Sequence, residues 1–166
     1  MNSQIERLKG VKGAYALMIE LVECRTIKIG KAGSASFPRG HYVYIGSALG
    51  RTATSLGWRL ARYRDIAGRK KKWHIDYLLA DISAKIRRIE YAETVESSEC
   101  NISLVISSKE WAEVPLSGLG ASDCREGCPA HLYRVNLNTL DALSREIGKA
   151  FKESGLDPKE LVLDWR

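Results

Sequence analysis

Two stretches in the first third of the chain decide the fold: Gly13-Ala-Tyr-Ala-Leu-Met-Ile-Glu-Leu-Val-Glu23 and His41-Tyr-Val-Tyr-Ile-Gly-Ser47. The first is apolar at nearly every position, which is typical of a strand buried on both faces of a sheet. The second is rich in aromatic and β-branched residues, which favour strands. Between them, Thr26-Ile-Lys-Ile29 alternates polar and apolar side chains like an edge strand. Together the three segments predict a small antiparallel meander.

The hydrophobic period changes after residue 50. Apolar residues then recur at gaps of three and four over residues 52–66, which predicts a helix with one buried stripe. Similar patterns predict helices over 73–80, 97–107 and 140–154, and strands over 85–92 and 132–135. Near the end of the chain, Pro158 suits a first helical position, so another turn or two of helix is expected there.

The predicted fold class is therefore α+β, with a mostly antiparallel sheet of three to five strands flanked by helices and a C-terminal helical extension. A chain of 166 residues fits one domain with one core. We expect a polar lead-in over residues 1–12, the main domain over 13–136 and the extension over 137–166.

Composition excludes several classes of protein. Hydrophobic residues make up 45% of the chain and charged residues 28%, so a packed fold is expected and global disorder is not. No apolar run approaches the roughly 20 residues that cross a bilayer, and the first residues lack the apolar core of a signal peptide. Four cysteines are too few for a disulfide scaffold. We expect a cytoplasmic protein with no membrane partner.

Positive charge is concentrated in one window. The chain has 26 Lys and Arg against 20 Asp and Glu, a net charge of +6. Residues 51–75 alone hold eight cations and one anion, so this window carries the whole surplus. Such a cluster is typical of a surface that meets a polyanion, and equally of a solvated loop that aids solubility. Trp58, Tyr63 and Trp73 lie among the cations, where they could stack on bases or belong to the core.

Gly13-Ala-Tyr15 and Tyr44-Ile-Gly46 each place a tyrosine on a predicted strand, and Arg59 lies on the helix that follows. This order resembles the GIY-YIG nuclease superfamily, named for two such tripeptides. The second tripeptide matches fully, and the first departs only at Ala14. Longer stretches are similar to one branch of archaeal and bacterial proteins classed as a domain of unknown function: Tyr42-Val-Tyr-Ile-Gly-Ser-Ala-Leu-Gly50, Trp73-His-Ile-Asp-Tyr-Leu-Leu79, and Gly120-Ala-Ser-Asp-Cys124 through His131.

The resemblance implies a set of catalytic residues. Tyr15 and Tyr44 match the tyrosines that help to bind and deprotonate the attacking water, and Arg59 matches the arginine that meets the scissile phosphate. Glu99 matches the glutamate that holds one divalent cation, Mg²⁺ or Mn²⁺, although Glu96, one turn earlier, is an alternative ligand. Helix first turns also favour acids for their dipole alone, so Glu99 has a purely structural reading as well.

These residue types suit phosphodiester hydrolysis. An arginine fork can bind the negative charge that gathers on the phosphate oxygens. A hard divalent cation keeps several waters, so a single carboxylate can hold it. Only about 0.1% of a free tyrosine is phenolate at pH 7, so a tyrosine acts as a base only beside a cation or a metal-bound water.

The same region supplies candidate nucleic-acid contacts. Tyr63 follows Arg59 by four residues, so both lie on one side of the predicted helix. His74, in the next helix, is either a phosphate contact or a satisfied structural histidine. The full set of predicted contacts is Arg51, Arg62, Tyr63, Lys70, Lys71, Lys72 and His74.

Cys124, Cys128 and His131 raise the question of a metal. Their spacing could place three zinc ligands near one turn, but a structural zinc site wants four. The fourth would have to be Cys100 or Cys24, and no second close pair exists. A packed loop near the active cleft is the favoured interpretation, with structural zinc and a Cys124–Cys128 disulfide as the less favoured ones.

The leading hypothesis is a metal-dependent endonuclease that acts on double-stranded or branched DNA, including structured or damaged DNA in repair. The rival is a non-catalytic nucleic-acid-binding module that keeps the fold and the basic face. An RNA-directed function is a more distant option, because nothing in the sequence tests for a 2′-hydroxyl. The helix at 140–154 is a candidate cover for the sheet or a homodimer contact.

Overall fold

The central strand of the structure, β1 (Gly13–Leu21), is buried almost throughout, as its continuous apolar sequence predicts. It pairs antiparallel with β4 (Gly40–Ala48) on one side and with β5 (Ala84–Glu93) on the other. These pairings come from a computed structural model that describes residues 3–122 and 124–163. Asp123, which belongs to one of the quoted motifs, lies outside the described residues.

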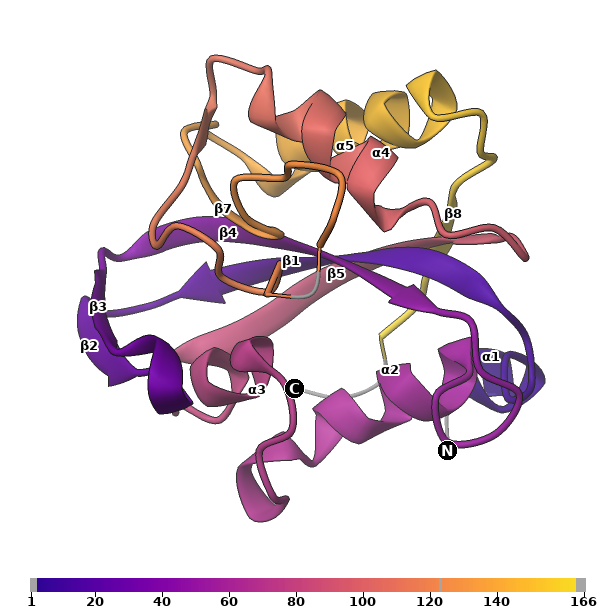
Figure 1. The fold of residues 1–166 in the computed structure, drawn as a ribbon, viewed down its shortest axis with the longest axis horizontal. Helices are drawn as coiled ribbons and strands as arrows, with labels where there is room; N and C mark the ends of the chain where they lie inside the picture. The colour runs from indigo at the N-terminus through magenta and orange to yellow at the C-terminus, as the bar shows by residue number, and fades with distance from the viewer. Residues whose placement is uncertain (1–2, 123, 164–166) are drawn as a thin grey trace.

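Shorter strands extend this centre to a six-stranded sheet in the order β6-β7-β4-β1-β5-β8. β7 (Leu132–Val135) pairs with β4, β6 (Ala112–Glu113) with β7, and β8 (Lys159–Leu161) with β5, all of them antiparallel. The sheet runs between two layers of helices (Figure 1). The predicted α+β class is confirmed, and the sheet is larger than the predicted range.

The predicted meander is wrong in one respect. β2 (Arg25–Lys28) does not join the main sheet but pairs with β3 (Ser34–Phe37) in a separate two-stranded ribbon. Both edges of β1 are taken by β4 and β5, so β2 has no free ladder there. Buried Ile27 and Phe37 nevertheless pack the ribbon against the main core. A short 3₁₀ turn, Gly30–Ala32, joins its two strands.

Two expectations near the chain ends are also corrected. The lead-in contains a helix, α1 (Ser3–Arg7), whose Ile5 is buried in the core. The segment after Pro158 is the strand β8 rather than a helical turn, because the outer edge of β5 offers it backbone partners. The Val162 backbone N–H then donates to the Gln4 side chain, which joins β8 to α1.

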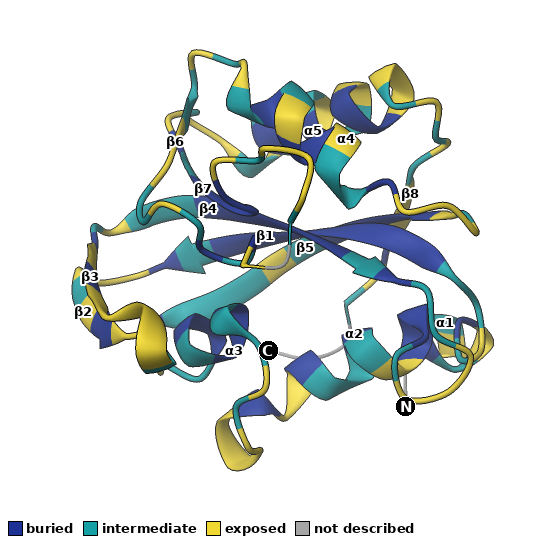
Figure 2. Cartoon of the chain, viewed as in Figure 1, coloured by how far each residue is buried: buried dark blue, intermediate teal, exposed yellow. Residues whose placement is uncertain are grey.

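The helices form one layer on each face of the sheet. With α1, α2 (Leu56–Arg64) and α3 (His74–Leu79) cover one face, and α4 (Glu99–Ser107) and α5 (Leu140–Glu153) cover the other. A 3₁₀ turn, Ile66–Gly68, follows α2. All four predicted helices are present, with ends shifted by a few residues. Buried positions follow the sheet and the inward side of both layers (Figure 2).

The C-terminal helix α5 covers the sheet. Its Leu143, Ile147 and Phe151 are buried against strand residues such as Met18, so its apolar face is used within the domain. A homodimer contact through α5 stays a prediction, and it would have to use the polar face of the helix. None of the helices in the described part of the chain has the length and apolar character needed to cross a membrane.

Candidate functional site

Two strand tyrosines lie side by side on one face of the sheet. In the β1–β4 register Tyr15 stands opposite Gly46 and Tyr44 opposite Leu17, so the two side chains project to the same side. Their ring centroids are 6.3 Å apart. Gly46 is required here because a Cβ at that position would overlap the Tyr15 ring. The sheet register therefore brings the two predicted tyrosines together.

Helix α2 adds an arginine and a third tyrosine to this pair. The Tyr63 hydroxyl lies 2.6 Å from the Tyr15 hydroxyl, and their ring centroids are 6.0 Å apart. Arg59, one turn earlier, donates from Nη1 to the Ser47 backbone carbonyl at the end of β4. The Arg59 guanidinium also lies over the Trp73 ring, 4.3 Å from its centroid. We call Tyr15, Tyr44, Arg59 and Tyr63 the tyrosine–arginine cluster.

Two buried polar atoms at this cluster lack a hydrogen-bond partner within the described part of the chain. They are Arg59 Nε, a donor, and Ser47 Oγ, which can donate and accept. Buried polar groups are nearly always paired, by protein, water or ligand. An unsatisfied N–H of a guanidinium cation is suited to an anionic oxygen.

Burial sets the protonation of the cluster. Burial raises the pKa of Tyr15, which the nearby Arg59 guanidinium partly opposes and the Glu99 carboxylate reinforces. Burial also raises the pKa of Tyr44 and of Tyr63 well above the ordinary value. For Arg59, burial lowers the pKa, but interactions with the phenols outweigh it and the net pKa is raised. Near pH 7 the site thus holds three neutral phenols and one guanidinium cation.

Glu99, not Glu96, is the acid near this cluster. It is the first residue of α4, and its carboxylate is close enough to raise the pKa of both Tyr15 and Tyr44. Glu99 Oε2 also lies 4.0 Å from His131 Nδ1. Glu96 lies in the exposed segment before the helix, where its backbone N–H bonds to the Thr94 hydroxyl.

Beside Glu99, three cysteines and a histidine converge. The side-chain ligand atoms of Cys100, Cys124, Cys128 and His131 all lie within 4.8 Å of one another. We call these four residues the cysteine–histidine cluster. Burial raises the pKa of the Cys100 thiol, whereas backbone N–H groups of residues 128 and 126 outweigh burial at Cys124 and lower the pKa of its thiol. These four residues are consistent with a structural metal site. Of the two candidates for the fourth ligand, Cys100 belongs to the cluster, whereas Cys24 is exposed and lies outside it.

Comparison with known protein families shows to which family the chain belongs. A sequence model of the family described as "Domain of unknown function DUF123" matches residues 14–155. The chain belongs to the DUF123 family. This match includes α5, both clusters and the sheet apart from Gly13 and the strand β8. Comparison with curated proteins found no match, and neither did comparison with solved structures.

In this DUF123 domain, Arg62 is committed to an internal ion pair. Its guanidinium bonds both carboxylate oxygens of buried Asp76, at 2.8 and 2.9 Å, and the Lys70 carbonyl at 2.8 Å. Asp76 also accepts the backbone N–H groups of Lys72 and Trp73 at the start of α3. This network fixes the basic loop against α2 and α3. The structural role of Asp76 was not predicted: its carboxylate accepts the Trp73 backbone N–H three residues earlier, which is one half of a capping box, and Trp73 has no side-chain acceptor to complete it.

The remaining predicted contacts of the DUF123 domain differ in their availability. Arg51, Lys70 and Lys72 are exposed, and Lys71 folds back on the carbonyl groups of Ala67 and Arg69. Trp73 lies under three cations, among them Arg62 and Lys72, whereas Trp58 is 47% exposed and carries Lys9 over its ring. As nucleic-acid contacts, these residues stay predictions.

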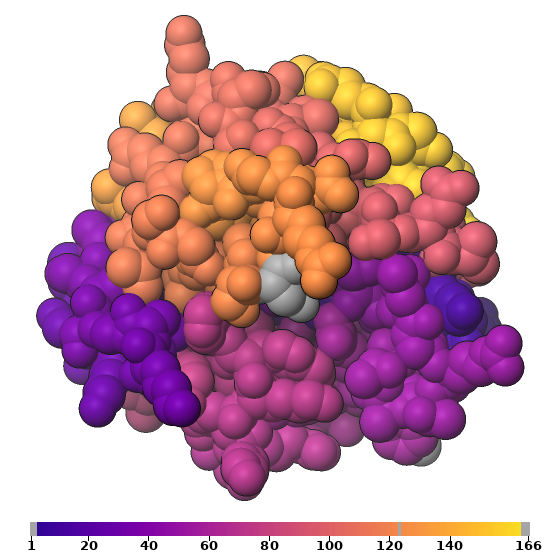
Figure 3. All heavy atoms as spheres, in the orientation of Figure 1, coloured from indigo at the N-terminus to yellow at the C-terminus, as the bar shows by residue number. Residues whose placement is uncertain are grey.

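His74 connects the α2–α3 layer to the loop of residues 116–131. Its Nδ1 accepts the Gly120 backbone N–H at 3.3 Å. Gly120 has a φ of +77°, and a Cβ there would lie 2.9 Å from Tyr44 Cε2, so this loop lies directly on the Tyr44 ring. Figure 3 shows the loop in orange against the magenta segment that contains α3. Gly120 is a site residue that sequence reasoning missed.

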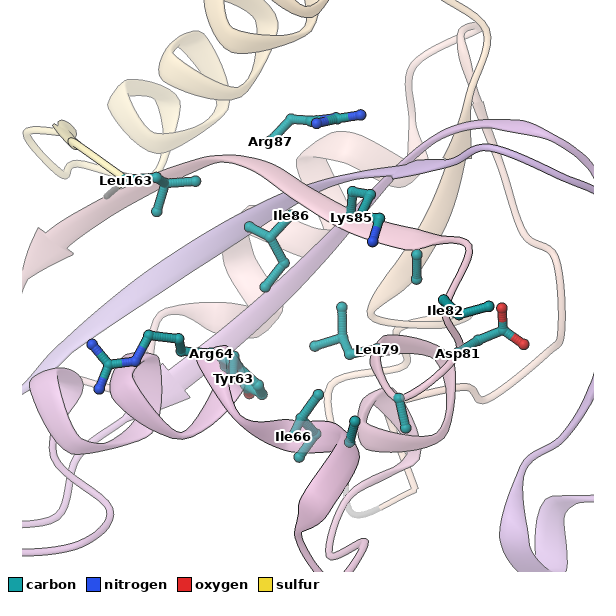
Figure 4. A pocket seen from close by; sticks show the side chains of 13 residues that line it. Tyr63, Arg64, Ile66, Leu79, Asp81, Ile82, Lys85, Ile86, Arg87 and Leu163 are labelled. Atoms are coloured by element: carbon teal, nitrogen blue, oxygen red, sulfur yellow. The ribbon is translucent and has the colours of Figure 1, made fainter. Parts of the chain in front are cut away.

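A separate pocket opens behind Tyr63. It has a volume of about 610 Å³ and is bounded by α2, α3 and β5, with Ile66, Leu79 and Ile86 on its walls (Figure 4). Arg64, Lys85 and Arg87 lie around it. Among the cluster residues it shares only Tyr63, so the pocket is distinct from the tyrosine–arginine cluster.

Proposed function

We propose that this DUF123 domain is a metal-dependent endonuclease of the GIY-YIG type that hydrolyses phosphodiester bonds in DNA. The observation that carries the proposal is the convergence of Tyr15, Tyr44 and Arg59, which are distant in sequence. The tripeptide order supports it from the sequence side. Structured or damaged DNA is the favoured substrate class, by the family resemblance alone.

Arg59 has the strongest case for a role in catalysis. Its Nη1 bond to the Ser47 carbonyl and its stack on Trp73 hold the guanidinium in one orientation. Its free, buried Nε and the free Ser47 hydroxyl are the groups that a phosphate oxygen would satisfy. A preorganised donor aimed at developing charge contributes about 10²–10³ in rate.

Glu99 is the proposed ligand of a divalent cation. Its carboxylate lies at the edge of the cluster, and a hard cation such as Mg²⁺ or Mn²⁺ needs few protein oxygens because it keeps most of its waters. When bound, that cation would supply positive charge to the phosphate and a more acidic water. Glu99 would also keep its contact with His131 on the other side.

The tyrosines position groups in this proposal and do not act as free bases. Burial holds the pKa of Tyr15 and Tyr44 above the ordinary value, so near pH 7 both phenols keep their protons. A neutral phenol can donate a hydrogen bond to a phosphate oxygen and accept one from a water. The Tyr63 hydroxyl fixes the direction of the Tyr15 hydroxyl.

Purified protein incubated with Mg²⁺ or Mn²⁺ and end-labelled branched, nicked or single-stranded DNA tests this function. Cleavage is expected, with a loss of at least about a hundredfold in Arg59→Ala and in Glu99→Ala. The matched controls are Arg64→Ala, from the exposed side of the same helix, and Glu96→Ala, from the segment before α4. Equal activity of all four variants would contradict the assignment.

A nucleic-acid-binding module without catalysis is the second candidate. The full burial of Tyr15 and the direct bond between two phenols favour it, since both are also what a packed aromatic core needs. In that case the parent protein binds the same DNA without cutting it, and binding survives in Arg59→Ala and Glu99→Ala. A salt titration measures phosphate contacts in either case, so cleavage is the deciding readout.

A further inference from the structure

The cysteine–histidine cluster has the dimensions of a four-coordinate cage. Cys100 Sγ lies 3.4 Å from Cys124 Sγ and 3.7 Å from His131 Nε2, and no pair of ligand atoms is more than 4.8 Å apart. With zinc–sulfur bonds of about 2.3 Å, the edges of a tetrahedron measure about 3.8 Å. Three sulfurs and one imidazole nitrogen at these separations match a Cys₃His site.

A disulfide accounts for this geometry less well. The 3.4 Å between Cys100 and Cys124 is well beyond an S–S bond of about 2.05 Å, and all four cysteines are free thiols. A disulfide would also leave a third cysteine and a buried histidine, 2% exposed, without a role. A metal ion uses all four side chains at once.

A metal ion at this cluster would add an anchor to the loop of residues 116–131, which is otherwise held by hydrogen bonds such as those from Gly118 to Pro129 and from His131 to Leu119. This loop contains no helix or strand in its described residues, and loops of this length in compact domains are uncommon and often functional. Cys124 and Cys128 would bind it to α4 on one side of the sheet, while Gly120 holds it to His74 on the other. One metal ion would thus fix the loop that lies on Tyr44.

His131 offers the two nitrogens that such a site uses. Nε2 faces the cysteine sulfurs, whereas Nδ1 lies 4.0 Å from Glu99 Oε2. Metal-bound histidines commonly direct their second nitrogen to a carboxylate, which sets the tautomer and the ring orientation. Glu99 is in the right place to be that carboxylate.

We propose that Cys100, Cys124, Cys128 and His131 bind one zinc ion, with three thiolate sulfurs and His131 Nε2 as ligands. The ion is structural, since all four positions are filled by protein. Binding displaces the three thiol protons to solvent and involves no change of oxidation state. The ion joins the loop to α4, and through His131 it orients Glu99.

Cobalt titration of the reduced, metal-stripped full chain tests the site directly. We expect one equivalent of Co²⁺ to produce the strong visible absorption of tetrahedral cobalt with thiolate ligands, and zinc to displace it at one ion per chain. Protein purified from zinc-supplemented cells should contain one zinc by elemental analysis. No such absorption, or a weak six-coordinate spectrum, would overturn the proposal.

Variants locate the ligands. Cys100→Ser and Cys128→Ser are expected to weaken Co²⁺ binding by at least tenfold, and Cys24→Ser, which alters an exposed cysteine outside the cluster, to leave it unchanged. Circular dichroism of each variant shows whether it folds, and the titration of the parent chain decides the proposal if one does not. Equal affinity in a folded Cys100→Ser or Cys128→Ser would overturn the ligand assignment.

Glu99→Gln tests the link to the carboxylate. We expect it to keep the tetrahedral spectrum but to weaken Co²⁺ binding about tenfold, as loss of a carboxylate behind a ligating histidine does. Glu96→Gln is the matched control. An unchanged affinity in Glu99→Gln would remove Glu99 from the metal site. The zinc assignment stands apart from the proposed nuclease, because every readout measures metal binding and none measures cleavage.

Discussion

At the scale of single residues, Gly46 shows how tightly the tyrosine–arginine cluster is built. A Cβ at position 46 would overlap the ring and the hydroxyl of Tyr15. Gly46 lies on β4 and Tyr15 on the neighbouring strand β1. Because β1 is also paired with β5 on its other side, its backbone cannot easily shift to relieve the overlap. The glycine of the second tripeptide is therefore explained by packing, independently of any catalytic role.

Gly46→Ala is expected to lower the free energy of unfolding by about 1–3 kcal/mol, the usual cost of overpacking a core. Gly68→Ala is the control, since nothing lies within 4 Å of a Cβ there. Urea unfolding followed by circular dichroism measures both variants. Equal midpoints for the two would show that Tyr15 is free to move aside.

The residues of the candidate site differ in how far the sequence could predict them. Tyr15 and Tyr44 were predicted from the two tripeptides, and Arg59 from a family resemblance that expects an arginine on the helix after them. The fourth ligand of the cysteine–histidine cluster could not be chosen, since Cys100 lies 24 residues before Cys124 and only the fold brings them together. Ser47 and Gly120 carried no pattern, because their roles are contacts across the chain.

At the scale of elements, the contact between α1 and α2 depends on Gly57. A Cβ on Gly57 would lie 2.5 Å from the Ile5 carbonyl oxygen and would also overlap Lys9. Helix propensity alone predicts that an alanine here stabilises α2 by about 1 kcal/mol. The backbone of α1 cannot yield as a side chain can, so the packing cost outweighs the gain.

Gly57→Ala should therefore destabilise the domain by about 1–3 kcal/mol. Gly148→Ala, in the middle of α5, is the matched comparison, because its Cβ meets only Glu90 Oε2 at an ordinary 3.7 Å. That variant should gain roughly 0.5–1 kcal/mol from propensity. Thermal unfolding of the two variants shows whether their changes in stability have opposite signs. Stabilisation by both substitutions would show that α1 is displaced easily.

Helices and strands were predicted where a segment carries its own hydrophobic periodicity. β1, α2, β5, α4 and α5 each carry a sustained pattern and were found in the expected places. The pairing of β2 with β3 was not predicted, because a strand's sequence does not say which edge is still free. β6 and β8 have two and three residues, too few for any alternation to register.

At the scale of the whole molecule, buried phenols tie stability to alkaline pH. Burial raises the pKa of Tyr15, Tyr44 and Tyr63, and it raises that of Tyr42 and Tyr133 to about 12. In the unfolded chain these groups lose their protons near pH 10. Above that pH the folded protein binds more protons than the unfolded chain, so the free energy of unfolding falls as pH rises.

We expect these phenols to contribute fully to stability below about pH 10, and the free energy of unfolding to fall progressively from there to pH 12, by up to roughly 1.4 kcal/mol per pH unit for each buried phenol. Urea midpoints over this range measure the loss, and phenolate absorbance shows that ionisation accompanies unfolding. Tyr42→Phe removes one of these ionising groups, so the free energy of unfolding of this variant should fall less steeply with pH. A midpoint that stays constant up to pH 12 would contradict the burial of these hydroxyls.

The stack at Trp73 has a practical consequence. Its indole ring faces the charged groups of Arg59, Arg62 and Lys72 at 4.3 to 4.9 Å. Indole emission responds to the local electric field, and an arriving polyanion would neutralise part of this charge, most directly at exposed Lys72. The protein thus carries its own optical reporter, whose fluorescence would register the docking of an oligonucleotide without any attached dye.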